Sequence, residues 1–458
     1  MKKSKIAVLA ALAIGVLVAF GFVLRGAVNR RAANRQPGLQ QSAAANRDAT
    51  PADARVQAAQ QTIEQSPDKP DGYNLLASAF MQKARETGDF GFNSRAEGAL
   101  ARSLEVDPEN YDTTKLRAKL LLTYHRFGEA LEVARRAQVL RPDDHDNYGA
   151  ITDALVELGN YPEAIAAAQK MVDLRPDSAS YARVSYLRSL HGDGEGAIAA
   201  MQVAVKAASP KDPEGAAWCR VHLGDELMTA GKQLEAEKEY DKALYLFPDY
   251  PLALAAKARA LIAKDDLEGA AKFYEQAQNR VPLPETAVAL GDLYQRLGRA
   301  EAAQRQYDLV EFIERHSAAS GTYSRQLAMF WVDHDQKLDE ALIIAQRERS
   351  TRQDIYTCDA LAWILLKNKR VDEAKQAIAE ALRLGTRDAR LYYHAGMIYD
   401  ELGDRKNAVR YLTLALQINP HFDVRQAELA QKSLTELKAG RNTTRELQAS
   451  AAVISTSE

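Results

Sequence analysis

Residues 223–248 read LGDELMTAGKQLEAEKEYDKALYLFP and give the clearest indication of the architecture. Gly224 and Ala236 are small enough to let two helices cross closely, and Tyr240 can fill the gap between neighbouring units. Pro248 follows the second segment, as proline commonly does because it cannot extend a helix. The stretch therefore predicts two helices joined by a turn.

The same pattern recurs at a fixed period. Residues 392–420, YYHAGMIYDELGDRKNAVRYLTLALQINP, repeat the small residues, the tyrosines and the closing proline. Prolines 34 residues apart mark the period elsewhere, in the series Pro108, Pro142, Pro176 and Pro210 and then in Pro248 and Pro282. A chain of 458 residues is too long for one compact core, since single cores stop growing at roughly 250–300 residues. A repeat array accounts for both the length and the period.

The region from Asp71 to Asp423 resembles the tetratricopeptide-repeat family in its period, small residues and prolines. The resemblance implies an all-α, right-handed superhelical solenoid of about ten repeats, in which the first helix of each repeat lines a concave face. The repeats are expected to begin near Asp71, Tyr111, His145, Ala179, Ala217, Pro251, Pro284, Thr322, Ile355 and Ala389. Helices at Asp53–Gln65 and Val424–Lys438 are expected to cap the two ends.

The N-terminus predicts a membrane anchor. Three lysines precede Ile6–Leu24, an unbroken run of 19 apolar or glycine residues. As a helix this run would reach about 28 Å, close to the roughly 30 Å apolar core of a bilayer. We expect an uncleaved signal-anchor, or transmembrane segment, over residues 1–31; a cleaved signal peptide and a buried soluble helix are the alternatives.

The rest of the chain divides by composition. Residues 32–51 are expected to form a flexible linker, residues 52–438 the solenoid, and residues 439–458 a disordered tail. Basic residues on the two sides of the anchor nearly balance, so charge alone does not orient it. The short N-terminal tail is typical of a bacterial signal-anchor, and it places the body outside the cytoplasm, in a periplasm-like compartment.

The remaining chemistry favours a protein without catalytic activity. The chain holds 60 basic and 62 acidic residues, so no net field points to nucleic acid. Cys219 and Cys358 are too far apart in the array to pair, and no phosphate loop, zinc helix or nucleophile elbow is present. Asp333-His334-Asp335 is interpreted as a solvated turn, and His394 as a packing residue. We therefore expect no enzyme activity, cofactor, metal or small-molecule substrate.

The concave groove is the predicted binding site. In this family the second, fifth, ninth and twelfth positions of each first helix point inward. Applied to the last three repeats, the rule gives an aromatic stripe with some charged residues, namely Tyr323, Phe330, Tyr356, Asp359, Trp363, Arg390, Tyr393 and Met397. Such a stripe is typical of a protein-binding surface, although each ring could instead pack between helices. In the second and third repeats the rule gives Asp112, Lys115, Lys119, Asp146 and Asp153, which indicate a solvated surface of mixed charge.

Two functions fit this organisation. The first is a membrane-tethered scaffold that binds partner peptides or helices, from cell-envelope proteins, in the groove. The second is a structural or assembly factor of an envelope complex that acts through its outer faces. Contact with the bilayer is expected only through Ile6–Leu24, and nucleic acid is not an expected partner.

Overall fold

The computed structural model describes residues 50–318 and 325–440. Within these ranges the chain forms 22 α-helices and no strand, which confirms the expected all-α solenoid. The predicted transmembrane segment Ile6–Leu24 lies outside the described residues, as do residues 32–49 of the linker and 441–458 of the tail. None of the described helices is long and apolar enough to cross a bilayer.

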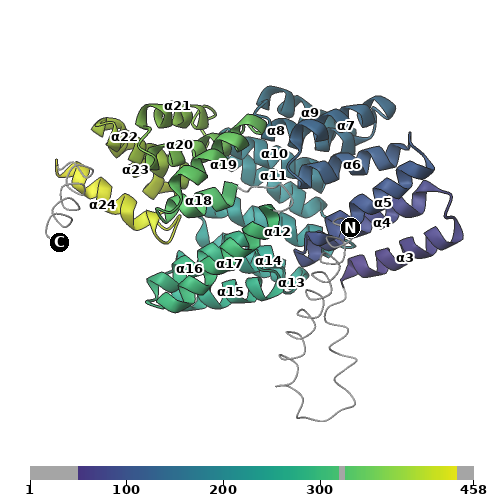
Figure 1. The fold of residues 1–458 in the computed structure, drawn as a ribbon, viewed down its shortest axis with the longest axis horizontal. Coiled ribbons are helices and arrows are strands. Elements are labelled where there is room, and N and C mark those ends of the chain that lie inside the picture. The colour runs from purple at the N-terminus through teal and green to yellow at the C-terminus, as the bar shows by residue number, and fades with distance from the viewer. Residues whose placement is uncertain (1–49, 319–324, 441–458) are drawn as a thin grey trace, which may run out of the picture. The chain divides into compact units, whose positions relative to one another are not determined.

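Ten helix pairs follow one another along the chain, and one further helix lies at each end (Figure 1). The end helices are α3 (Pro51–Gln65) and α24 (Gln426–Lys438). The first helices of the pairs are α4 (Pro70–Thr87), α6 (Tyr111–Thr123), α8 (His145–Glu157), α10 (Ser178–Leu190), α12 (Pro213–Thr229), α14 (Pro251–Ile262), α16 (Pro284–Arg296), α18 (Arg325–Asp333), α20 (Ile355–Lys367) and α22 (Ala389–Glu401). The second helices are α5 (Gly91–Val106), α7 (Phe127–Leu140), α9 (Tyr161–Leu174), α11 (Gly194–Ala207), α13 (Gln233–Leu246), α15 (Leu267–Arg280), α17 (Ala300–Ala318), α19 (Leu338–Thr351), α21 (Val371–Ala381) and α23 (Arg405–Ile418).

Each pair turns through a residue in the left-handed backbone region, and the turn between α18 and α19 has a second one, Lys337. Six pairs place glycine there, with φ between 70° and 75°. The other four use the residues His125, Asp265, Asp335 and Lys369, with φ between 53° and 61°. The turn geometry is therefore common to all ten pairs, and a glycine is only its easiest solution, because a Cβ atom makes the left-handed conformation costly.

Small residues set the distance between the two helices of a pair. A Cβ atom on Gly224 would lie 2.3 Å from the ring of Tyr240, and one on Gly396 would lie 2.6 Å from Leu412. Tyr240 and Leu412 are fully buried. These contacts confirm that the glycines of the repeat pattern allow close helix crossing.

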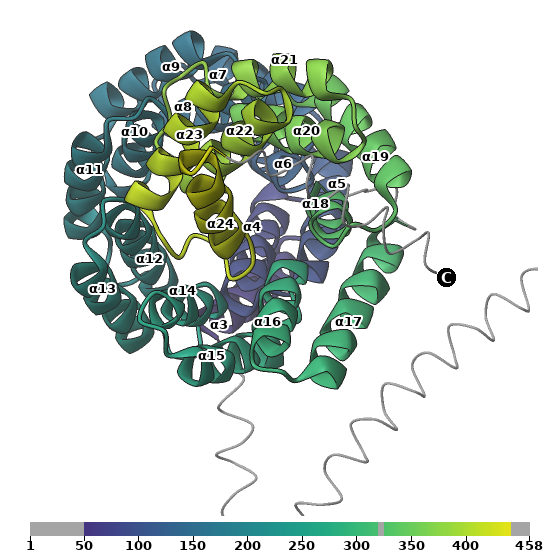
Figure 2. The same ribbon diagram turned by 90° about the vertical axis from the view of Figure 1, so that its left-hand side faces the viewer.

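Figure 2 shows the helix pairs of residues 52–440 following one another around a ring. Pairs that are far apart in the sequence come into contact across this ring. The turn between α8 and α9 meets the segment that precedes α20, where Gln353 donates its backbone N–H to Glu157 O at 3.0 Å and Ile355 N–H donates to the Tyr161 hydroxyl at 3.0 Å. A Cβ atom on Gly159 would lie 2.5 Å from Gln353 O, so a larger residue has no room at this junction.

A buried ion pair closes the same junction. Arg352 is 8% exposed, and its guanidinium contacts Glu157 across the junction as well as Glu348 at 3.2 Å and Asp354 at 3.4 Å. Burial raises the pKa of Glu157, although Arg352 acts in the opposite direction. We refer to Glu157, Arg352 and Asp354 as the junction cluster.

The turn at Asp333-His334-Asp335 is only partly the solvated turn that the sequence suggested. Asp335 takes the left-handed position and pairs with Lys367 at 2.6 Å. The partly buried His334 instead packs against aromatic rings, and its Nε2 lies 2.8 Å from Asp292 Oδ1. Asp333 accepts a 2.8 Å hydrogen bond from the Trp363 indole, and its burial raises the pKa of its carboxyl. The interpretation was wrong for these two residues because their partners come from other repeats.

Candidate functional site

The main cavity lies on the inner side of the superhelix. It has a volume of about 540 Å³ and is lined mainly by the first helices α12, α14, α16, α20 and α22. Residues 418–424, which connect α23 to α24, close one wall. The connection is held there by Arg296, whose guanidinium donates to Val424 O at 3.3 Å and pairs with Glu428 at 3.1 Å. We call this space the inner cavity.

Acidic residues outnumber basic ones in the inner cavity. Its lining contains two arginines, Arg259 and Arg390, against the five aspartates Asp225, Asp292, Asp359, Asp388 and Asp423. A cavity with this balance favours a cationic ligand and disfavours a phosphate backbone.

Four of the five aspartates have side-chain partners. Asp225 pairs with Arg259 at 2.7 Å, and Asp423 with Arg390 at 2.9 Å. Asp292 and Asp359 each accept from a histidine of the following repeat, His334 at 2.8 Å and His394 at 2.9 Å.

Asp388 is the exception within the described residues. Its carboxylate caps the N-terminus of α22, where it accepts the Leu391 N–H at 2.9 Å, and no basic side chain lies within ion-pair distance of it. Burial raises the pKa of Asp388, and the nearby Asp359 carboxylate raises it further. The charge of Asp388 is therefore the least compensated in the cavity.

Two tyrosines that line the inner cavity, Tyr274 and Tyr356, have hydroxyls that form no hydrogen bond among the described residues. Tyr274 of α15 is 4% exposed, and its pKa is raised by burial and lowered by the nearby Arg259 and Arg390. Tyr356 of α20 is partly exposed, and burial followed by the charge of Asp388 raises its pKa. Neither hydroxyl has a hydrogen-bond partner among the described residues, so both remain available to a ligand.

The predicted groove residues separate into two groups. Tyr356, Asp359 and Arg390 line the inner cavity. The others, Phe330, Trp363, Tyr393 and Met397, do not line it, and Tyr323 lies outside the described residues. Phe330, Trp363 and Tyr393 are only 1–4% exposed, so the continuous exposed stripe expected from the sequence is interrupted at these rings.

The buried rings form the packing between the last repeats. The rings of Trp363 and His394 stack with centroids 4.5 Å apart, and Tyr393 packs against both Trp363 and Phe422 at 5.5 Å. His394 is fully buried. The structure thus places His394 in inter-repeat packing, as expected, and it assigns the same role to the neighbouring aromatics.

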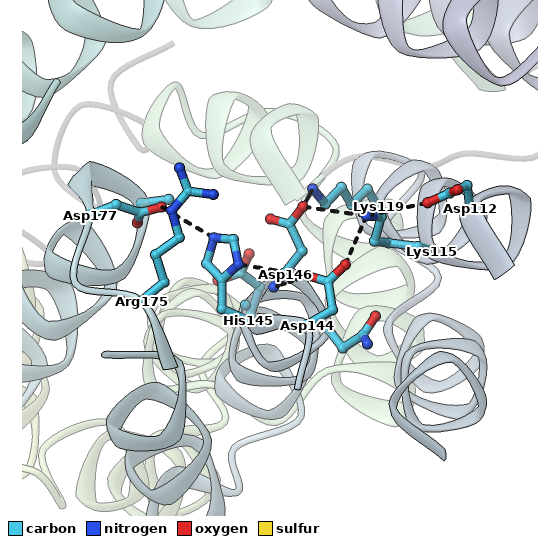
Figure 3. A network of polar contacts seen from close by, with 12 residues as sticks. Asp112, Lys115, Lys119, Asp144, His145, Asp146, Arg175 and Asp177 are labelled. Atoms are coloured by element: carbon cyan, nitrogen blue, oxygen red, sulfur yellow. Dashed lines mark hydrogen bonds and ion pairs between the residues drawn. The ribbon is translucent and has the colours of Figure 1, made fainter. Parts of the chain in front are cut away.

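The residues proposed as a mixed-charge surface form a specific ion-pair network instead (Figure 3). Lys115 lies 2.9 Å from Asp144 and 3.5 Å from Asp112, and Lys119 lies 3.0 Å from Asp146. Burial alone would raise the pKa of Asp144, but Lys115 and a hydroxyl donor lower it to about 2. The network joins α6 to α8 and extends through His145 to Asp177 at the start of α10, so it holds repeats together.

A second cavity of about 510 Å³ lies between α4, α8, α10 and α12. Trp218 and His222 line it, with ring centroids 4.0 Å apart, and Tyr186 and Glu226 complete much of its wall. Burial lowers the pKa of His222 and raises that of Glu226 to about 7. The lining of this cavity also carries charged residues, namely Arg85, Asp153, Arg183, Asp212, Glu214 and Glu226.

Several lining residues were missed although the positional rule finds them. Applied to the fifth, sixth and seventh repeats, the same rule gives twelve residues, and five of them line the inner cavity, namely Asp225, Met228, Arg259, Ile262 and Asp292. The rule cannot find Tyr274, which lies on a second helix, or the connection at 418–424, which depends on how the last helix packs.

Comparison with known proteins supports the repeat family. Tetratricopeptide-repeat models match residues 81–145, 151–213, 222–283 and 389–422. These matches, which cover just under half of the chain, support the resemblance to the tetratricopeptide-repeat family. No curated protein matches the chain by sequence.

Solved structures show only distant similarity. A human IFIT1 dimer with m7Gppp-AAAA is 15% identical, covers 69% of this chain and 72% of its own, and has a TM-score of 0.48. The Cut9–Hcn1 hetero-tetramer of APC/C is 14% identical over 83% of this chain and 92% of its own, with a TM-score of 0.37. PilW, a type IV pilus biogenesis factor, is 18% identical over 47% of this chain and 96% of its own, with a TM-score of 0.38. Similarity at this level carries no information on partners.

Proposed function

We propose that this protein is a non-catalytic, membrane-tethered scaffold that binds partner peptides or helices on the inner face of its tetratricopeptide repeats. The inner cavity carries the proposal. Its volume of about 540 Å³ falls in the range of ligand-binding cavities, and it presents unpaired polar groups on rigid helices. Groups of this kind favour recognition of a polar partner segment over simple packing.

The chemistry of the described side chains favours binding over catalysis. Both cysteines are buried, and burial raises the pKa of Cys219 to about 11, which keeps its thiol protonated and poorly nucleophilic at neutral pH. His334 and His394 are committed to carboxylates inside the repeat packing. The acidic inner cavity argues against nucleic acid as the partner.

The membrane tether in this proposal is supported by the sequence alone. Ile6–Leu24 is long enough to span a bilayer as a helix, and residues 32–51 would separate it from the repeats. The repeats then act outside the cytoplasm, at a bacterial inner membrane-like surface, on proteins of the cell envelope.

Photo-crosslinking from matched positions tests the scaffold. A photoreactive phenylalanine replaces Tyr356 in the inner cavity or Tyr245, which is 86% exposed on α13. The expected result in native membranes is one heterologous protein captured from position 356 and not from position 245. Capture of a second copy of the chain from Tyr245, with nothing from Tyr356, would instead indicate assembly through the outer face.

Fractionation tests the tether separately. The full chain is expected in the membrane pellet and to resist extraction with carbonate, whereas a chain lacking residues 1–31 is expected in the soluble fraction. A full chain found in the soluble fraction would contradict the anchor and leave the groove untouched.

A further inference from the structure

We propose that the inner cavity binds a partner peptide through a lysine or arginine side chain, which inserts between Asp359 and Asp388. The inference rests on the proposed scaffold function and specifies the chemistry of its ligand. It comes from a comparison among the repeats of this one chain.

Aspartates cap the first helices of several repeats, and each accepts a backbone N–H in the first turn of its helix. These cap aspartates are Asp144, Asp177, Asp212, Asp354 and Asp388. An aspartate is favourable at this position because its carboxylate satisfies a free N–H group and complements the helix dipole.

The residue 29 positions before a cap aspartate comes from the preceding first helix, and it is basic for three of the five cap aspartates, Asp144, Asp212 and Asp354. Lys115 lies 2.9 Å from Asp144, and Arg325 lies 3.8 Å from Asp354. Arg183 holds the same position before Asp212 and lines one cavity with it, although its guanidinium pairs with Asp153 at 2.6 Å. Asp177 is compensated differently, by His145 at 3.1 Å and an arginine at 3.4 Å.

At Asp388 the sign of this position is reversed. The residue 29 positions earlier is Asp359, and its carboxylate raises the pKa of Asp388 through repulsion. Figure 3 shows the ordinary arrangement, in which the Lys115 ammonium lies beside Asp144. In the ninth and tenth repeats the chain therefore places two carboxylates where three of the other four cap aspartates follow a basic residue.

Nearby basic groups already pair with other carboxylates, although Arg390 lowers the pKa of Asp388 in part. Arg390 is engaged with Asp423 at 2.9 Å, and Arg259 with Asp225 at 2.7 Å. His394 already binds Asp359. A cationic side chain from outside would satisfy Asp388 and reduce the repulsion between the two carboxylates.

Tyr274 provides an independent sign that a ligand enters. Its side chain is 96% removed from solvent, it lines the inner cavity, and its hydroxyl has no hydrogen-bond partner among the described residues. The Tyr274 hydroxyl oxygen is not itself fully buried, so a ligand in the cavity can reach it and form a hydrogen bond with it. A basic side chain with several N–H donors, followed by a peptide backbone, can bond to the carboxylate and also to Tyr274 and Tyr356.

A random octapeptide library displayed on phage tests the inference with the full chain in detergent as the target. Peptides selected on the wild type are expected to be enriched in lysine or arginine at one position. The enrichment should disappear with Asp388→Asn, which keeps a good helix cap, and persist with Asp177→Asn, a matched cap variant outside the inner cavity. Selection without a basic preference, or a preference unchanged by Asp388→Asn, would overturn the proposal.

Affinity measurements then distinguish the contribution of the basic side chain from that of the rest of the peptide. Replacing the selected arginine by citrulline, or the lysine by norleucine, should weaken binding at least 10-fold, and Tyr274→Phe should weaken it by a smaller factor. Binding of N-acetyl-arginine amide as tight as that of the peptide would overturn the peptide part. If Tyr356 still captures a partner whose binding is insensitive to Asp388→Asn, the scaffold stands and this inference falls. Loss of capture from Tyr356 would instead remove the scaffold itself.

Discussion

Replacing Arg352 with methionine should destabilise the fold strongly, although Arg352 belongs to no helix core. The side chain is 8% exposed and lies among three carboxylates, those of Glu157, Glu348 and Asp354. Methionine fills much of the same volume and removes the charge. The three carboxylates would then face each other in a partly buried site, with Arg325, 3.8 Å from Asp354, as a more distant counter-ion.

The expected loss is about 3–5 kcal/mol of unfolding free energy, the usual cost of removing one partner from a buried ion pair. Glu157→Gln should cost less, because burial already raises the pKa of this carboxyl and a neutral amide can still accept from Arg352. Since the two residues touch directly, their effects should not add, and a coupling of about 1–3 kcal/mol is expected.

Urea unfolding of the two single variants and the double variant, followed by far-ultraviolet circular dichroism, measures this coupling. Arg126 and Glu129 serve as the control pair, because both are about half exposed and adjacent on one helix turn. Little coupling is expected there. If the coupling between Arg352 and Glu157 is no larger than that of the control pair, their direct interaction does not contribute to the stability of the fold.

Three further changes test other features. Gly224→Ala should cost about 1–3 kcal/mol in urea unfolding, because its Cβ would meet the Tyr240 ring at 2.3 Å, and an unchanged midpoint would contradict the close crossing. Lys369→Gly should stabilise the fold by about 0.5–1 kcal/mol, because glycine relieves a left-handed backbone at an exposed turn, and a loss would show that Lys369 makes a contribution of its own. Glu226 has a pKa raised to about 7 by burial, so the native state retains a proton that the unfolded state has lost, and stability falls as pH rises from about 4.5 to about 7. Glu226→Gln should therefore stabilise by on the order of 3 kcal/mol at pH 8 and by little at pH 4, and an equal gain at both would contradict the pKa.

The repeat fold was predictable because its signals are local. Glycines at the crossing points, a tyrosine between helices and a proline after seven of the ten pairs recur with a period of 34 residues, and each has a direct structural cause. Six of the ten expected repeat starts, including Tyr111, Pro251 and Ala389, coincide with the observed helix starts. The largest difference occurs at Pro213, where the helix begins four residues before the expected Ala217.

The candidate site was predictable only in part, because exposure depends on contacts between repeats. The positional rule correctly directed Tyr356 and Arg390 toward the inner cavity. It could not show that the Trp363 ring is covered by His394 from the next repeat, or that residues 418–424 close the cavity. The contact between Glu157 and Arg352, 195 residues apart, leaves no periodic trace in the sequence at all.

The junction between distant repeats also determines when the protein can complete its folding during synthesis. Tyr161 and Leu190 must wait for partners that lie 194 and 196 residues later in the chain. At translation rates of about 5–20 residues per second, the third and fourth repeats remain uncovered at this edge for roughly 10–40 s. A nascent chain interrupted after the eighth repeat would lack the last two repeats. It would also leave the edges of the third and fourth repeats exposed to contacts with other proteins.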